Sequence, residues 1–270
     1  MGAKTPILEV KNLTKKFPSS VSSSAKATDD KKTAEGKGDF VAVDGISFTV
    51  NQGEVLGFLG PNGAGKSTTI NCILGVVEKD GGEVKMFGKD LASNRSEVMK
   101  NVNYCSAEYV LPWNLTLYEN LLVYAHLYEV ENAKQRVMEV LELLDMADLR
   151  NKIIRSLSLG QRTRANFCKA LINKPKLLLL DEPMASMDPD VVDRGIRLIK
   201  KIQKEDKMTI LYTSHNMWEI EQVANDVVFV NHGVIIAQGS PLELTRQELE
   251  LEAKEPNLRE VFIHLSRRPS

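Results

Sequence analysis

The sequence predicts an α/β fold built around a parallel sheet. From residue 55 onward, short apolar runs alternate with segments whose apolar residues recur at helical spacing. Such alternation indicates buried strands joined by crossover helices. The expected strands span 55–59, 84–87, 177–180, 209–213 and 227–230, and the expected helices among them span 66–74, 191–202 and 217–223.

An antiparallel pair of strands is expected ahead of this alternation. Apolar residues at 7–10 and the alternating pattern of 41–50 predict two strands joined by a long loop. The loop, residues 18–39, carries a single bulky apolar residue, Val21, so it cannot bury enough surface to offset the entropy of ordering. We interpret it as a disordered insertion, with a tag or linker as the alternative and an interaction tail less favoured.

A helical insert is expected between the strands at 84–87 and 177–180. Residues 117–144 have apolar faces at helical spacing, with Asn132 as a cap between two helices. We therefore divide the chain into a main domain, residues 1–240, and a C-terminal helical extension, residues 241–270. The main domain includes a helical subdomain, residues 106–172.

The composition indicates a folded protein without a charge-based preference for nucleic acid. The 270 residues are 43% hydrophobic and 26% charged, with a net charge of −1, so no basic field is expected. Apolar runs stop far short of the roughly 20 residues of a membrane span, and the N-terminus does not resemble a secretory signal. Three cysteines without CxxC spacing argue against a disulfide framework or a zinc site.

A phosphate-binding loop is the strongest motif. Residues 60–67 satisfy G-x-x-x-x-G-K-[ST] between an expected strand and an expected helix. Glycines let backbone N–H groups converge on phosphate oxygens, Lys66 adds a positive charge, and Ser67 is placed to ligate Mg²⁺. The motif predicts a nucleoside triphosphate site formed by Gly60, Pro61, Asn62, Gly63, Ala64, Gly65, Lys66, Ser67 and Thr68.

Two carboxylates end the apolar run at 177–180. Asp181 and Glu182 stand at the carboxyl end of this strand, where ligands of parallel sheets bind. We expect Asp181 to hold Mg²⁺ through water and Glu182 to polarise the water that attacks the phosphate. Together with the phosphate loop, they predict an enzyme that hydrolyses a nucleoside triphosphate.

Three further motifs make the chain resemble the ATPase subunits of ABC transporters. Residues 157–161, L-S-L-G-Q, are similar to the LSGGQ signature of that family, and His215 follows a strand as the family's switch histidine does. Phe17 is placed like the aromatic residue that stacks on adenine. The resemblance covers nearly the whole chain. It implies a P-loop NTPase of the ABC ATPase type, with a RecA-like core, an N-terminal antiparallel β subdomain and a helical signature subdomain.

The resemblance also implies a mechanism. Two ATPase domains would meet head to tail around ATP and Mg²⁺, so that Ser158, Gly160 and Gln161 contact the nucleotide of the partner. Glu182 would activate water, His215 would contact the γ-phosphate, and hydrolysis would let the dimer open.

Two positions depart from the family pattern. Leu159 replaces the third signature residue, and Ala107 occupies the place of the Q-loop glutamine. Either Glu108 or Ser106 supplies the missing ligand, or hydrolysis is slower than usual. We expect ATPase activity to be retained, because the other catalytic residues are present.

The C-terminal residues indicate which branch of the family the chain resembles. Residues 256–265 resemble the terminal helix of exporters of the drug, sodium and polysaccharide type, whose ATPase is a chain separate from the membrane permease. The resemblance implies an ATPase subunit, in a homodimer or paired with a second ATPase subunit, held by a permease at the cytoplasmic face of the membrane. The alternative is a soluble or regulatory ABC ATPase that dimerises with ATP and drives no transport.

An apolar cluster is a candidate surface for docking the permease. It comprises Tyr109, Leu111, Pro112 and Trp113, and exposed aromatic patches of this kind mark interfaces. The alternative, which the sequence leaves open, is that Trp113 packs under the following helix.

Overall fold

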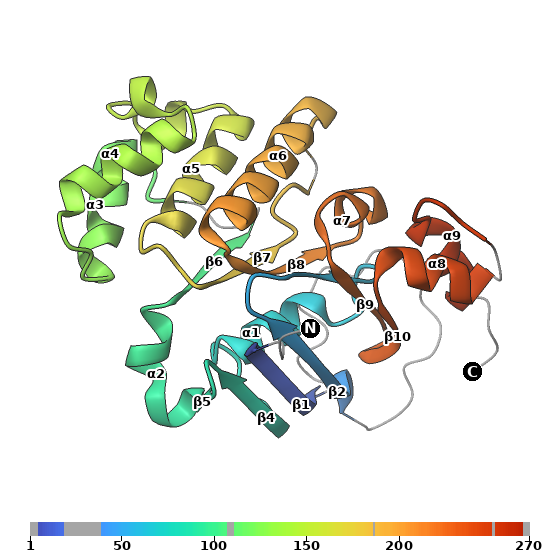
Figure 1. Ribbon diagram of the computed structural model, residues 1–270. Coiled ribbons are helices and arrows are strands. Elements are labelled where there is room, and N and C mark those ends of the chain that lie inside the picture. Colours follow the sequence, from blue (N-terminus) through green and yellow to red (C-terminus); the bar gives the residue numbers. More distant parts are fainter. Residues whose placement is uncertain (1–4, 19–38, 107–110, 186, 250–251, 267–270) are drawn as a thin grey trace.

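Two β-sheets organise the protein (Figure 1). The computed structural model describes residues 5–18, 39–106, 111–185, 187–249 and 252–266. The larger sheet has six strands in the order β10-β9-β3-β8-β7-β6, and the smaller has four in the order β2-β1-β4-β5. In chain order the strands are β1 (Pro6–Phe17), β2 (Phe40–Asn51), β3 (Val55–Leu59), β4 (Gly81–Met86), β5 (Lys89–Asp90), β6 (Val102–Ser106), β7 (Leu177–Asp181), β8 (Thr209–Ser214), β9 (Asp226–Asn231) and β10 (Val234–Gly239).

The six-stranded sheet confirms the predicted α/β core. Strands β9, β3, β8, β7 and β6 run parallel, whereas β10 pairs with β9 antiparallel. Strands β3, β7 and β8 are buried along their whole length, because helices and the second sheet cover both of their faces. The sequence does not predict β6 and β10, whose apolar runs are short and mixed with polar residues.

Strands β1 and β2 form the antiparallel pair expected ahead of residue 55. Their register runs from Pro6 opposite Asn51 to Phe17 opposite Phe40. The segment interpreted as a disordered insertion, 18–39, connects these strands, and its residues 19–38 lie outside the described part of the chain.

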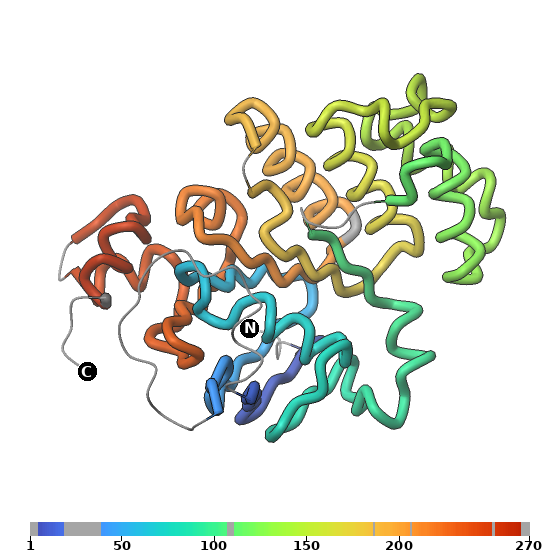
Figure 2. Tube along the Cα trace, turned by 180° about the vertical axis from the view of Figure 1, so that it is seen from behind, coloured from blue at the N-terminus to red at the C-terminus, as the bar shows by residue number. Residues whose placement is uncertain are grey.

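Two groups of helices lie at opposite ends of the molecule (Figure 1). Helices α3, α4 and α5 gather at one end and α8 and α9 at the other, and the view from behind shows the same separation (Figure 2). The helices are α1 (Lys66–Ile73), α2 (Leu91–Met99), α3 (Leu117–Leu127), α4 (Ala133–Leu143), α5 (Leu159–Leu171), α6 (Pro189–Asp206), α7 (Met217–Val223), α8 (Pro241–Leu249) and α9 (Leu258–Ser266), with 3₁₀ turns at Ala147–Leu149 and Ile154–Ser156.

The predicted helical insert corresponds to α3 and α4. Their buried faces include Leu121 and Ala125 on α3, and Val137 and Val140 on α4. Asn132 does precede α4, but it has a φ of 52° and its side chain makes no capping hydrogen bond. Asn132 is thus the N-cap residue, as expected, but the capping hydrogen bond is absent, because its backbone is left-handed rather than extended as at an ordinary N-cap.

The three cysteines are buried free thiols. Burial raises the pKa of Cys105 to about 12 and also raises the pKa values of Cys72 and Cys168. Within the described ranges, no helix combines the length and apolar character that crossing a membrane requires.

Candidate functional site

The phosphate loop connects β3 to α1, as the motif predicts. Two of its glycines are required by close backbone contacts. A Cβ on Gly60 would lie 2.3 Å from the carbonyl oxygen of Val230, and one on Gly65 would lie 2.4 Å from that of Ala42. Gly65 also has a φ of 100°, a conformation that disfavours residues with a side chain. The loop is therefore fixed against β9 and β2, with its N–H groups at the start of α1.

Lys66 is buried at the first position of α1. Its Nζ donates hydrogen bonds to the carbonyl oxygens of Gly60, at 2.8 Å, and Pro61, at 3.1 Å. The same nitrogen lies 3.0 Å from Oε1 of Glu182. The loop lysine is thus held directly against the carboxylate that the sequence predicts to activate water.

Asp181 ends strand β7 as a buried carboxylate. Its Oδ1 accepts a hydrogen bond of 2.6 Å from the hydroxyl of Thr213, and its Oδ2 accepts a longer one of 3.4 Å from Tyr104. Burial raises the pKa of Tyr104 to about 12, so its hydroxyl stays a donor at neutral pH. Two adjacent strands, β8 and β6, therefore orient this carboxylate.

Glu182 lies between two cationic or potentially cationic groups. Its Oε2 is 2.9 Å from Nδ1 of His215, while its Oε1 faces Lys66. Burial raises the pKa of the Glu182 carboxyl, but the hydrogen bond and charge of Lys66, with His215, outweigh burial, so its pKa lies below the ordinary value. The carboxylate is ionised at neutral pH, as a group that polarises water must be.

The backbone of Glu182 is held in an unusual conformation. Its φ is 45°, in the left-handed region that residues with a side chain rarely adopt. Its N–H donates to both the carbonyl oxygen and the hydroxyl of Thr213, each at 3.1 Å. Thr213 therefore positions both acidic residues. Sequence reasoning missed it, because the pairing of β7 with β8 is not visible in sequence order.

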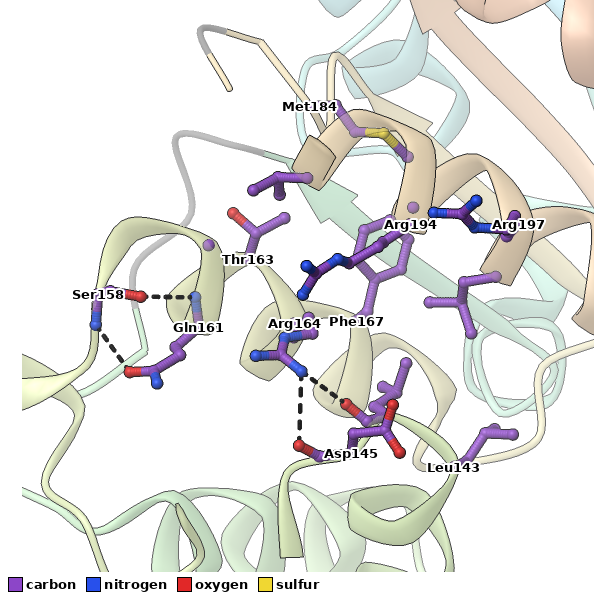
Figure 3. A pocket seen from close by; sticks show the side chains of 15 residues that line it. Leu143, Asp145, Ser158, Gln161, Thr163, Arg164, Phe167, Met184, Arg194 and Arg197 are labelled. Atoms are coloured by element: carbon purple, nitrogen blue, oxygen red, sulfur yellow. Dashed lines mark hydrogen bonds between the residues drawn. The ribbon is translucent and has the colours of Figure 1, made fainter. Parts of the chain in front are cut away.

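The signature residues form the N-terminus of α5. Ser158 caps the helix: its Oγ accepts from the N–H of Gln161 at 3.3 Å, and its own N–H donates to Gln161 Oε1 at 3.0 Å (Figure 3). Gly160 lies close to α6, where an added Cβ would be 3.3 Å from Val191. Leu159 is 58% exposed, so the departure from the family pattern places an apolar side chain on the surface.

Phe17 lies at the end of β1, paired with Phe40 of β2. The ammonium of Lys15 is 5.2 Å from the centre of its ring, and Phe40 is 53% exposed. Strand β2 reaches Gly65 of the phosphate loop two residues further on, at Ala42. Phe40 is therefore a second aromatic residue on this side, which the sequence analysis did not single out.

The position of the missing glutamine cannot be compared with the site, because Ala107 and Glu108 lie outside the described residues. Ser106 is described: it ends β6 and is buried opposite Asp181 in the parallel register. Of the two proposed substitutes, Ser106 is thus next to the strand that carries the acidic pair.

The predicted site residues fall into two sets. Lys66, Glu182 and His215 are in direct contact, and Asp181 joins them through Thr213. In the described part of the chain, no hydrogen bond or ion pair connects these residues to Ser158, Gly160 or Gln161.

The donor set suits Mg²⁺ better than a transition metal. Ser67 and Asp181 offer a hydroxyl and a carboxylate, the hard oxygen ligands that Mg²⁺ prefers. Among the described residues, no group of three or more His, Cys, Asp or Glu side chains could hold a metal by itself. A cation here would complete its shell with phosphate oxygens and water, as Mg²⁺ does in nucleotide sites.

Comparison with known families decides the assignment. A family model described as ABC transporter matches residues 43–185, more than half of the chain. The chain belongs to the ABC transporter family. It is an ATP-binding, ATP-hydrolysing domain of that family, which confirms the enzyme class and the fold predicted from the motifs.

Relatives of this ABC domain carry related descriptions. It is 36% identical over 215 residues to the linearmycin resistance ATP-binding protein of Bacillus subtilis, covering 79% of this chain and 68% of that protein. It is 34% identical over 197 residues to the bacitracin transport ATP-binding protein of Bacillus licheniformis, covering 73% of this chain and 64% of that protein. The chain therefore spans less than two thirds of the second relative. A solved ATP binding subunit of an ABC transporter is 25% identical, with a TM-score of 0.78, covering 97% of this chain and 100% of that one.

Proposed function

We propose that this ABC domain is the ATPase subunit of a transporter and drives a separate membrane permease in the direction of export. The descriptions of the relatives, a bacitracin transport protein and a linearmycin resistance protein, support this function. The domain would act at the cytoplasmic face of the membrane, where the permease holds it, as a homodimer or beside a second ATPase subunit.

The contacts of Lys66 and His215 with Glu182 support the ATP-hydrolysing part of this proposal. Lys66 uses loop carbonyls and Glu182 as partners, at 2.8 to 3.1 Å, and the phosphates of ATP would compete for the same ammonium group. When Lys66 turns to the phosphates, one carboxylate oxygen of Glu182 becomes free to accept a proton from water. His215, still beside the other oxygen, would then contact the γ-phosphate.

Ser67 and Asp181 would hold Mg²⁺ in this site. When bound, the cation would neutralise charge on the phosphates of ATP. The hydroxyl of Thr213 donates a hydrogen bond of 2.6 Å to Asp181. This bond fixes the orientation of the carboxylate, so its remaining lone pairs would be available to the cation.

The signature residues would complete the site of a second subunit. The N-terminus of α5 carries the first backbone N–H groups of the helix, which have no acceptor within the helix backbone, and the positive end of the helix dipole. Ser158, Gly160 and Gln161 would therefore bind the γ-phosphate held by the phosphate loop of the partner. Phe17 would stack on adenine, and residues 106–172 would move as one helical subdomain relative to the remainder of 1–240, with 241–270 as a C-terminal extension.

The docking surface for the permease would include Trp113. Its side chain is 49% exposed, and the Arg162 guanidinium lies 5.2 Å from the centre of its ring. Exposure favours the docking interpretation over packing beneath α3. Leu111 is buried, and Tyr109 lies outside the described residues.

ATP-dependent dimerisation tests the head-to-tail site. We expect Glu182→Gln, which blocks turnover, to form a dimer with ATP and remain monomeric with ADP, as measured by light scattering. Adding Ser158→Ala should weaken the dimer about tenfold or more, because a hydrogen bond to a charged group contributes about 1.5–3 kcal/mol.

Thr116→Ala is the matched control. Thr116 and Glu119 form the same capping box at α3 as Ser158 and Gln161 form at α5. Both substitutions should cost about 1 kcal/mol of stability, but only Ser158→Ala should weaken the dimer. Equal dimerisation of the two variants would refute the role of the signature.

A further inference from the structure

His215 is held in place by its backbone more than by its side chain. The side chain is 48% exposed, and its recorded partner is Glu182, 2.9 Å away. The residue lies in the short turn between β8 and α7. Because packing does not fix a half-exposed ring, the distance to Glu182 depends on the conformation of this turn.

A buried carboxylate, Glu219, lies beneath the turn. It is 5% exposed. Its Oε2 accepts hydrogen bonds from the hydroxyls of Tyr212, at 2.6 Å, and Ser214, at 3.1 Å. Its Oε1 accepts one from the side-chain amide of Asn216, also at 3.1 Å. Glu219 therefore binds the residue before His215 and the residue after it.

The two flanking residues are also bound to each other. The N–H of Asn216 donates to Ser214 Oγ at 2.9 Å, and Asn216 Oδ1 accepts from the N–H of Trp218 at 3.2 Å. In an ordinary capping box, a glutamate at the third helical position accepts from the backbone N–H of the cap residue. Here that N–H is satisfied by Ser214, so Glu219 serves side chains of the turn and strand instead.

Burying a carboxylate at this position costs free energy. A buried carboxylate loses its hydration, and in the described part of the chain no cationic side chain lies within ion-pair distance of Glu219. Burial, followed by the Glu219 charge, raises the pKa of Tyr212, which keeps its hydroxyl protonated as a donor. An apolar residue would fill the same space without a desolvation cost. The role of Glu219 therefore lies in its hydrogen bonds and not in packing.

We propose that Glu219 is a positioning residue for catalysis: it fixes Ser214 and Asn216, and thereby sets His215 at hydrogen-bonding distance from Glu182. The proposal rests on the proposed role of His215 in hydrolysis. Among the described residues, Glu219 makes no hydrogen bond or ion pair to Lys66, Glu182 or His215, so it acts on the site through the turn.

Two conservative variants on one helix test the proposal. Glu219→Gln keeps the shape of the side chain but replaces one acceptor oxygen with a donor, which conflicts with the donors around it. Glu221→Gln is the matched control, because the hydrogen bond of Glu221 Oε1 is to the N–H of Leu258 in α9, and in the described part of the chain Glu221 is not bonded to Ser214, His215 or Asn216. We expect Glu219→Gln to lower kcat for ATP about tenfold with KM nearly unchanged, and Glu221→Gln to lower neither.

A spectroscopic readout separates positioning from stability. The ¹⁵N shift of His215 Nδ1 in the nucleotide-free protein reports its hydrogen bond to Glu182, and Glu182→Ala gives the value without that bond. Glu219→Gln should move the shift toward that value. Loss of kcat or thermal stability with an unmoved shift would overturn the proposal.

A second pair of variants keeps the test valid if Glu219→Gln folds poorly. Tyr212→Phe and Asn216→Ala each remove one donor to Glu219, but only Asn216 belongs to the turn. The shift should move in Asn216→Ala and stay in Tyr212→Phe, and equal shifts would contradict the proposal. If His215→Ala leaves kcat unchanged, the proposed function of His215 fails, whereas the shift measurements still decide whether Glu219 positions it.

Discussion

The two halves of the proposed ATP site differ in how their polar groups are satisfied. In the phosphate-loop half, Lys66 and His215 both contact the carboxylate of Glu182, at 3.0 and 2.9 Å respectively. In the signature half, the side chains of Ser158 and Gln161 cap each other's backbone N–H groups at the start of α5. One half is a connected network within the chain, and the other is a helix end directed outward.

This difference predicts that the phosphate-loop half controls hydrolysis and the signature half controls assembly with a second subunit. The connected half contains every group proposed to act on water, so its substitutions should change the rate of hydrolysis. Among the residues that the structure describes, no hydrogen bond or ion pair joins the signature half to that network, so its substitutions should change assembly with a partner. The predictions below test this division, beginning with the largest expected effect.

Glu182→Gln should abolish most hydrolysis while keeping the fold. General base catalysis contributes about 10²- to 10⁴-fold, and glutamine cannot accept the proton, so kcat should fall by about that factor. Steady-state phosphate release measures the rate, and titration with ATP should show that binding is retained. A kcat within about tenfold of wild type would show that another group activates the water.

Trp113→Ala should weaken docking to the permease more than ATP binding. Buried aromatic residues at interface centres contribute about 2 kcal/mol or more, which corresponds to roughly 30-fold in affinity. Co-purification with the permease in detergent measures the effect. Trp218→Ala is the control, because Trp218 is similarly exposed, at 46% against 49%, but lies on α7. Equal losses from both variants would refute the docking surface.

This second prediction also sharpens the comparison of the two halves. Arg162 lies on α5, in the same helix that the signature begins, and its guanidinium faces the Trp113 ring at 5.2 Å. The signature half is thus physically linked to the proposed docking surface, whereas in the described ranges no hydrogen bond or ion pair of Lys66, Glu182 or His215 reaches Trp113.

Thr213→Val should reduce kcat about tenfold. Valine matches the shape of threonine but cannot donate to Asp181 or accept from the Glu182 N–H. The loss should also lower the free energy of unfolding by about 1–3 kcal/mol, the cost of leaving buried polar groups unsatisfied. Thr213→Ser, measured beside it in ATPase and denaturant experiments, should restore both values. Failure of serine to restore kcat would contradict the role given to the hydroxyl.

The sequence predicted the local parts of this network but not its connections. The phosphate loop, the acidic pair and His215 follow from motifs within a few residues of a strand end, and their elements lie within a few residues of the expected bounds. The contacts of Thr213 and Tyr104 with Asp181 depend on β8 and β6 flanking β7. Strand order depends on how all the elements pack together, so it cannot be predicted from local sequence patterns alone.

The same limit explains the missing capping hydrogen bond at Asn132 and the absence of Glu219 from the predicted site. Asparagine favours both capping and left-handed turns, and the short connection between α3 and α4 selects the turn. Glu219 reads in sequence as an ordinary acidic residue in the first turn of a helix. Only the fold shows that its side chain points inward, beneath the turn that carries His215.

Acid should weaken the Lys66–Glu182 contact, with the smallest effect of the four predictions. The pKa of Glu182 lies below its ordinary value of 4.5, so the contact stabilises the nucleotide-free protein above about pH 4.5 and is lost as pH falls further. The group is partly exposed, so we expect at most about 1 kcal/mol. The difference in unfolding free energy between wild type and Glu182→Gln should shrink below that pH. A difference that grows with acid would contradict the sign.

The pairing of Phe17 with Phe40 has a practical consequence for protein engineering. These residues end two adjacent strands, so their backbones are only about 5 Å apart, and a compact turn can bridge them. The segment between them is therefore a natural point at which to graft a reporter domain whose own termini lie close together. Such a chimera would carry its label at the end of β1 and β2, beside the residue proposed to stack on adenine.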